Sequence, residues 1–128
     1  MRDFNPKSDS DYSTDLKDII ENGNVKKMNE FCSKYGEKFA RGGLSTSQIR
    51  KIFDEILTMH EYEEKSLLLL RPKLAYTVGK HRRKINIIEE FGKLIDDAIN
   101  ITNEKNFENF KNFVEAIVAY HKYYGGKD

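Results

Sequence analysis

The chain has 128 residues, which is enough for one domain with a single hydrophobic core and argues against a second independent core. Its 22 Lys and Arg nearly balance its 21 Asp and Glu, so the total charge alone gives no indication of a nucleic-acid partner. The single cysteine, Cys32, excludes an internal disulfide and a multi-cysteine zinc site and is typical of a reducing compartment, so we expect the cytoplasm.

Residues 1–13 are polar, carry early acids and have no apolar stretch of signal-peptide length, so we expect a polar lead-in and no secretory leader. The longest apolar run is Leu67 to Leu70, far shorter than the roughly 20 residues that cross a bilayer. We therefore expect no contact with a membrane.

The first two predicted helices lie in the amino-terminal third. A short helix over Thr14–Glu21 ends at Asn22-Gly23, because this dipeptide accommodates the left-handed backbone of a helix stop. A second helix over Asn24–Ala40 is predicted by apolar residues that repeat every three or four positions, namely Val25, Met28, Phe31, Cys32, Tyr35 and Phe39.

After the Gly42-Gly43 break, the next helix has a distinct start signal. The Ser45 hydroxyl and the Gln48 side chain are spaced to form a capping box, and an apolar stripe follows it: Ile49, Ile52, Phe53 and Ile56. The apolar segment Leu67–Val78 contains Pro72, which is tolerated best in a first helical turn. We therefore predict that one helix ends and another begins at Arg71-Pro72.

Two more amphipathic helices are predicted in the carboxyl-terminal half, over Arg82–Ile101 and Asn103–Tyr124, and Gly125-Gly126 supplies a stop. No strand-like alternation of any length interrupts the helical pattern. The sequence therefore predicts an all-α, compact bundle of five or six helices in a single domain.

No motif of a catalytic or metal site is present. The chain lacks paired Glu-x-x-His, HExxH, phosphate-binding Gly-rich loops and GxSxG, so we expect no cofactor, no metal and no enzyme activity. His121 falls on the apolar stripe of its helix and is interpreted as a buried core histidine. Cys32 lies in an amphipathic pattern and is interpreted as a small buried apolar group.

Charge is segregated along the chain. From Lys65 to Ile88 there is no Asp or Glu but seven cations: Lys65, Arg71, Lys73, Lys80, Arg82, Arg83 and Lys84. From Glu89 to Glu115 there are seven acidic residues and only three lysines. A basic middle beside an acidic flank indicates a localised site for an anion.

The basic cluster at 81–84 lies at the predicted start of a helix, where the macrodipole disfavours cations, so helix stability does not explain it. A polyanion such as RNA would explain it, with phosphate contacts that position the strand without reading its bases. The alternative is an ordinary solvated run of charge. Tyr76 is either a stacking platform for a base or a core residue.

Three segments then resemble a known family. They are residues 43–51 (GLSTSQIRK), 70–76 (LRPKLAY) and 113–122 (FVEAIVAYHK), in that order and within a region from about Phe39 to the carboxyl terminus. Together they resemble the small subunit of the type III-A CRISPR (Csm) interference complex. The resemblance implies a helical bundle without an active site of its own.

The resemblance further implies the partners and the contacts. The small subunit would lie with further copies of itself in a filament, beside the other Csm subunits, and hold the target strand of the guide RNA–target RNA duplex. By position in the motifs, the expected phosphate contacts are Arg50, Lys51, Arg71, Lys73 and Lys80. Arg82 and Arg83 are added from charge alone. Where the family often has Gly-Arg, this chain has Gly79-Lys80, which lacks the bidentate guanidinium.

Two other classes of function are compatible with the same residues. One is a helical adaptor that binds only protein, with its basic patch matching an acidic partner. The other is an RNA-cleaving subunit that uses His81 with Arg82 and Arg83, for which no supporting motif exists. RNA binding that weakens with salt would favour the RNA-binding subunit over the adaptor.

Overall fold

The computed structural model describes the backbone of residues 6–128 and the side chains from Tyr12 onward. This part of the chain contains six helices and no strand, which confirms the predicted all-α bundle. The helices are α1 (Pro6–Asn22), α2 (Val25–Arg41), α3 (Thr46–Thr58), α4 (Glu64–His81), α5 (Ile87–Asn100) and α6 (Phe107–Tyr123).

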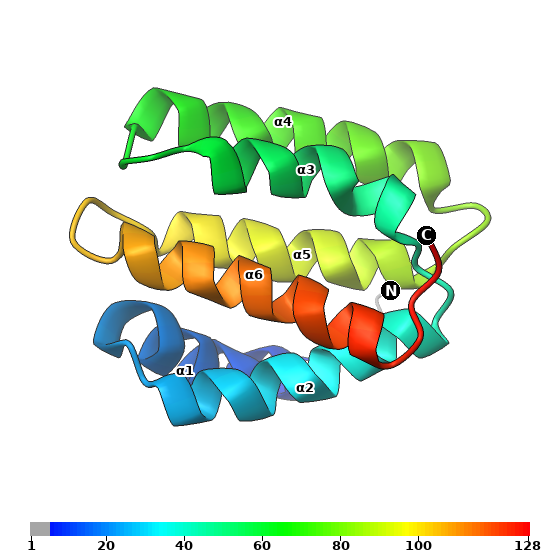
Figure 1. The fold of residues 1–128 in the computed structure, drawn as a ribbon, viewed down its shortest axis with the longest axis horizontal. Helices are drawn as coiled ribbons and strands as arrows, with labels where there is room; N and C mark the ends of the chain where they lie inside the picture. Colours follow the sequence, from blue (N-terminus) through cyan, green and yellow to red (C-terminus); the bar gives the residue numbers. More distant parts are fainter. Residues whose placement is uncertain (1–5) are drawn as a thin grey trace.

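The helices stack as three layers of two, with α5 and α6 between the α3–α4 pair and the α1–α2 pair (Figure 1). The central layer is covered on both sides, and its side chains dominate the fully buried core; α5 alone buries Ile88, Phe91, Leu94, Ile95 and Ala98. Helix α6 contacts α1, α2, α3 and α5, and its most extensive contact is with α2. One continuous core therefore joins all three layers.

The predicted starts of α2 and α3 are confirmed. Asn24 caps α2, with its side-chain oxygen accepting from the Lys27 backbone N–H at 3.0 Å, after Gly23 has turned the chain at φ +69°. Ser45 and Gln48 form the capping box at α3, where the Ser45 backbone N–H donates to Gln48 Oε1 at 2.8 Å. Local side-chain chemistry sets both boundaries.

Helix α1 begins at Pro6, eight residues before the predicted Thr14, so the polar lead-in assigned to residues 1–13 was wrong from residue 6 onward. Proline suits a first helical position because the missing N–H would have no partner there. Polar composition alone led to the error. Residues 1–5 of the predicted lead-in lie outside the described residues.

The predicted break at Arg71-Pro72 was also wrong, because α4 runs without interruption from Glu64 to His81 with Pro72 inside it. Pro72 cannot donate to the carbonyl of Leu68, four residues earlier. Both residues lie on the exposed side of α4, where water can satisfy that carbonyl. The helix keeps its course because Leu67, Leu70 and Leu74 anchor the opposite side in the core.

Two helices start later than predicted. Helix α5 begins at Ile87 and not at Arg82, because residues 82–86 form a turn between α4 and α5. Helix α6 begins at Phe107 and not at Asn103. The Asn103 N–H donates to Asn106 Oδ1 at 2.8 Å, and Asn106 Nδ2 donates to the Ile101 carbonyl at 2.9 Å, so this turn is held by its own side chains.

Helices α2 and α6 approach each other closely at Gly36 of α2. A methyl group there would lie 2.7 Å from Tyr120 Cβ and 2.8 Å from the His121 backbone nitrogen of α6. His121 is fully buried, with its Nε2 2.6 Å from the Leu44 carbonyl oxygen, which confirms the interpretation as a hydrogen-bonded core histidine. The α2–α6 contact therefore depends on the absence of a side chain at Gly36.

We predict opposite effects of alanine at two helical glycines. Gly36→Ala should lower the free energy of unfolding by about 1–3 kcal/mol, because the new methyl group forces α2 and α6 apart. Gly79→Ala, in exposed α4, places its methyl within 4 Å of no described atom and should raise the free energy of unfolding by about 0.5–1 kcal/mol. Urea unfolding followed by circular dichroism measures both, and a shift of the two midpoints in the same direction would contradict this packing.

Candidate functional site

The seven cations expected to contact phosphate lie on α3, on α4 and in the turn after α4. Arg50 and Lys51 project from α3, Arg71, Lys73 and Lys80 from α4, and Arg82 and Arg83 lie in the turn. The beginning of α3, the end of α4 and the chain's carboxyl terminus all lie at one end of the bundle (Figure 1). We call this end the basic end.

Arg71 is engaged by α5. Its Nε donates to Asp96 Oδ1 at 2.7 Å and its Nη2 donates to Asp96 Oδ2 at 3.0 Å, a bidentate arrangement. These hydrogen bonds, and then the Asp96 charge, raise the pKa of Arg71 further above its usual value. Arg71 thus fastens α4 to α5, and much of its charge is already compensated.

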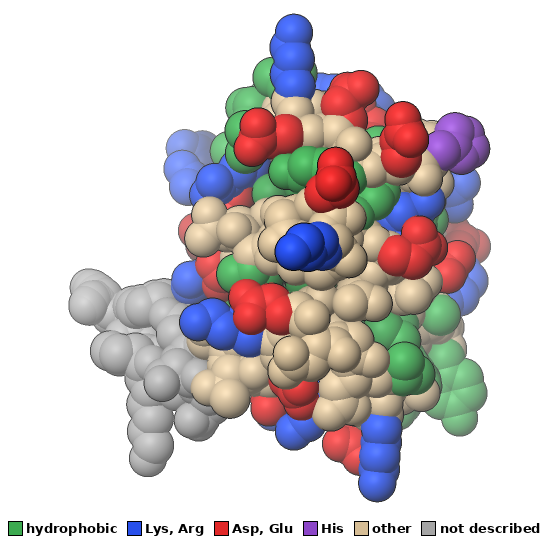
Figure 2. All heavy atoms as spheres, turned by 90° about the vertical axis from the view of Figure 1, so that its left-hand side faces the viewer, with side chains coloured by type: hydrophobic (Ala, Val, Ile, Leu, Met, Phe, Trp, Pro, Cys, Tyr) green, Lys and Arg blue, Asp and Glu red, His purple; other side chains and the backbone are tan. Residues whose placement is uncertain are grey.

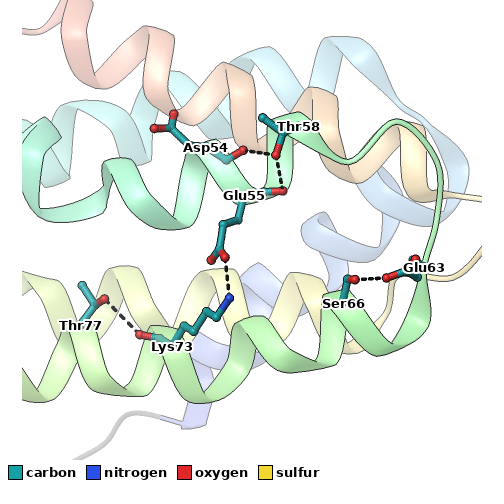
Figure 3. Close-up of polar contacts among 7 residues, drawn as sticks. All are labelled: Asp54, Glu55, Thr58, Glu63, Ser66, Lys73 and Thr77. Atoms are coloured by element: carbon teal, nitrogen blue, oxygen red, sulfur yellow. Dashed lines mark hydrogen bonds and ion pairs between the residues drawn. The ribbon is translucent and has the colours of Figure 1, made fainter.

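Lys73 is engaged by α3. Its ammonium lies 2.5 Å from Glu55 Oε1, and Figure 3 shows this ion pair bridging the two helices. One turn farther along α4, the Thr77 hydroxyl donates to the Lys73 carbonyl at 3.1 Å. Arg71 and Lys73 therefore hold α4 from both sides, and their role in binding phosphate stays a prediction.

The other five predicted residues have no ion pair with any described side chain. We call them the unpaired cations, and each is exposed: Arg50, Lys51, Lys80, Arg82 and Arg83. Lys84, exposed and equally without an ion pair among the described residues, belongs to the same end but was not among the predicted contacts. The signal for it was the charge run itself, in which it is the last member.

The unpaired cations do not share one flat patch. Lys51 and Lys80 line a groove of about 700 Å³ between α3 and α4, together with Tyr76 and His81. Arg82 lines a shallower depression on the α5 side of α4. Arg50 lies near the carboxyl terminus, where the hydrogen bond and charge of Lys122 and, more weakly, the charge of Arg50 lower the pKa of Asp128. The cations therefore surround the basic end.

The charge cluster at 81–84 sits at a helix end and not at a helix start. Lys80 and His81 occupy the last turn of α4, and the Arg82 N–H closes that turn on the Val78 carbonyl at 2.9 Å. The helix macrodipole favours cations at this end. The dipole argument from the sequence was therefore wrong, and the case for an anion rests on the absence of carboxylate partners.

The opposite end of the bundle has a different surface. There the α1–α2, α3–α4 and α5–α6 loops come together, and Figure 2 shows acidic and basic side chains interspersed over this face. A polyanion would meet repulsion as well as attraction on it. The opposite end is therefore a poor surface for a polyanion.

Metal ligands and the single cysteine were the other candidates for chemistry. Among them, no group of three or more His, Cys, Asp or Glu side chains is placed to hold a metal ion. The Cys32 thiol is buried, as interpreted from the sequence, and donates weakly to the Phe113 carbonyl at 3.6 Å. Burial raises the pKa of this thiol well above its usual value, which keeps it protonated and unreactive. No helix in the described part of the chain is long and apolar enough to cross a membrane.

Tyr76 is not a core residue. Its side chain is 70% exposed on the rim of the α3–α4 groove, between Lys73 and Lys80 on the same side of α4. Of the two roles open from the sequence, the structure excludes the core. Periodicity could not decide this, because apolar residues surround the whole circumference of α4.

We predict that the two arginines of the α5 side of α4 differ in their effect on stability. Arg71→Gln should lower the free energy of unfolding by about 0.5–1 kcal/mol, because it breaks a partly exposed bidentate ion pair. Arg82→Gln, the matched control, should change it by less than about 0.5 kcal/mol. Denaturant unfolding measures both, and equal losses in the two variants would contradict the assigned roles.

Comparison with known proteins is consistent with these features. Residues 22–127 match the family model described as Csm2 Type III-A. The CRISPR system Cms protein Csm2 of Streptococcus thermophilus is 28% identical over 93 residues, which cover 66% of this chain and 76% of that protein. No solved structure matches the chain significantly.

Proposed function

This chain belongs to the Csm2 type III-A family, the small subunit of the type III-A CRISPR (Csm) complex, and we propose that in this complex it is a non-catalytic RNA-binding subunit. It would contact the phosphate backbone of the target RNA along the guide–target duplex, in the cytoplasm. One observation carries the proposal. The unpaired cations at the basic end form no ion pair among the described residues, and Arg50 interacts only weakly with the Asp128 carboxylate, so they are available to an external anion.

The energetics favour a polyanion over a single anion. The net charge is only +1, so attraction comes from the local arrangement of Lys and Arg and not from the molecule as a whole. Each cation that neutralises a phosphate releases a counterion, and several contacts on one strand add. Because the cations are distributed around the basic end, they can contact several phosphates of an RNA backbone that passes along this end.

The same geometry supports binding without base readout. Lys51, Lys80 and Arg83 are exposed, and no hydrogen bond to another described residue holds any of these side chains in one orientation. Lys and Arg in such settings contact phosphate and position the strand. The proposed subunit therefore holds RNA of any sequence, while the guide supplies specificity.

Because one subunit alone would bind RNA weakly, we expect several copies to bind one strand together. One small subunit offers few phosphate contacts, and several copies in a filament beside the guide-bearing subunits would bind one strand together with high effective concentration. Membership of the Csm complex supplies the other subunits as partners. RNA cleavage and other chemistry would then belong to those subunits.

A second candidate function is a protein-binding adaptor. The observation that favours it is a set of apolar side chains on the outer side of α4, where Leu68 and Leu69 are each 50% exposed. An acidic, partly apolar partner would fit this side of the helix, whose flanks carry Lys65 and Lys73. Apart from Lys73, which is also a predicted phosphate contact, this contact and RNA binding use different residues and are compatible.

We predict that cations at the basic end, and not total charge, determine RNA affinity. The variant Lys51→Gln/Lys80→Gln/Arg83→Gln should reduce the slope of log affinity against log salt by about 2–3, since each lost phosphate contact removes about 0.7–0.9. The measurement is a salt series with a guide–target RNA duplex, using several unrelated sequences. All of them should lose affinity alike.

The control variant, Lys17→Gln/Lys26→Gln/Lys105→Gln, removes the same charge from exposed residues away from the basic end. It should leave the slope within about one contact of wild type. Equal losses in both variants would mean that only net charge matters. If wild type bound no RNA even in the assembled complex, the adaptor would replace the RNA-binding subunit.

A further inference from the structure

The groove between α3 and α4 has two unlike halves. At one half Lys51 and Lys80 supply positive charge near the beginning of α3 and the end of α4. At the other half Asp54 and Glu55 line the groove, and the Lys73–Glu55 ion pair spans the two helices (Figure 3). Phosphate is attracted to the first half and repelled by Asp54 at the second, so an anionic ligand has one preferred orientation.

Between these halves the wall is largely apolar. Ile52, Pro72 and Tyr76 contribute to it; Ile52 is buried, and Tyr76 is exposed. Among the described side chains, the Tyr76 ring has no aromatic or cation contact and its hydroxyl has no hydrogen bond. The Tyr76 ring is 70% exposed beside unpaired lysines, and no described residue stacks on it. It can therefore receive an external aromatic ring.

Three of the groove's polar side chains, those of Gln48, Ser47 and Thr77, already have a hydrogen-bond partner within the fold. Gln48 Oε1 accepts from the Ser45 backbone, the Ser47 hydroxyl is paired with that of Ser45 at 3.1 Å, and the Thr77 hydroxyl donates to the Lys73 carbonyl. These groups are therefore poorly placed to read the edge of a base. The groove offers stacking and charge, a combination that tolerates any base.

We propose that this groove receives one unpaired nucleotide of a bound RNA, with its base stacked on Tyr76 and its flanking phosphates at Lys51 and Lys80. The inference rests on the proposed function, since it names the part of the RNA that one face of the basic end holds. The flat ring of the base matches the groove's apolar wall, and the adjacent phosphates match its cationic half. A fully paired strand has no free base to place there.

The test compares two RNA duplexes that differ by one unpaired nucleotide. One duplex carries a single 2-aminopurine bulge and the other is fully paired, and each is titrated with the full chain at low salt. Wild type should bind the bulged duplex more tightly and alter the 2-aminopurine fluorescence as the base stacks. Tyr76→Leu should weaken binding of the bulged duplex roughly tenfold, the fold-change expected for loss of one base–aromatic stack.

Two further variants make the test specific. Tyr76→Phe keeps the ring and should retain the preference for the bulge. Tyr123→Leu removes a ring that is 77% exposed at the end of α6 and should also retain it. Because both tyrosines are exposed, neither leucine variant disturbs the core, and circular dichroism verifies the fold.

The outcomes separate this inference from the proposed function. If wild type binds both duplexes equally, or Tyr76→Leu keeps the preference for the bulge, the stacking site is refuted while phosphate binding stands. If neither duplex binds at any salt concentration, the proposed function fails and the inference fails with it. If Tyr123→Leu loses the preference as fully as Tyr76→Leu, the groove is not the site.

Discussion

The contact between α2 and α6 is the constraint on which the rest of the structure depends. Gly36 lets the two helices approach until a single methyl group would meet Tyr120 and the backbone of His121. At that separation Phe110, Phe113, Val114 and Ile117 of α6 are fully buried. Interiors packed at this density do not adjust continuously, so the position of α6 is fixed along its length.

The fixed α6 also sets the basic end. His121 reaches the Leu44 carbonyl, and Gly126 lies against the His121 ring where no side chain would fit. The Lys127 carbonyl then accepts from the Thr46 backbone N–H at 2.7 Å, at the first residue of α3. The carboxyl terminus is thereby held against the start of the helix that carries Arg50 and Lys51.

Two kinds of cation follow from this scaffold. The charges of Arg71 and Lys73 are compensated within the chain, by ion pairs with Asp96 of α5 and Glu55 of α3. By fixing α4 they also fix the position of Lys80, whose charge has no described partner. The near-neutral total thus includes both cations that are paired within the fold, such as Arg71 and Lys73, and cations without an ion pair, among them the five at the basic end.

The fold could be predicted from local signals wherever these acted alone. The capping box at Ser45 and the apolar stripe of α2 gave correct elements, because both depend on residues a few positions apart. Pro72 misled because tertiary anchoring by Leu67, Leu70 and Leu74 outweighs the lost hydrogen bond. The positions of prolines and the spacing of apolar residues along the sequence do not indicate such tertiary anchoring.

The candidate site was less accessible to sequence reasoning. The basic run identified the right region, but the macrodipole argument failed since the helix boundary lay five residues later than expected. The pair Arg71–Asp96 joins residues 25 positions apart, and no local rule predicts it. Only the fold separates cations that stabilise the molecule from those that remain available to a ligand.

The most direct test of the central claim is nuclear magnetic resonance of the labelled chain during titration with a guide–target RNA duplex. Backbone signals of Lys51, Lys80 and residues 82–84 should shift, and those of the α1–α2 and α5–α6 loops should remain unchanged. Shifts confined to those loops, or spread evenly over the molecule, would contradict the assignment of RNA binding to the unpaired cations.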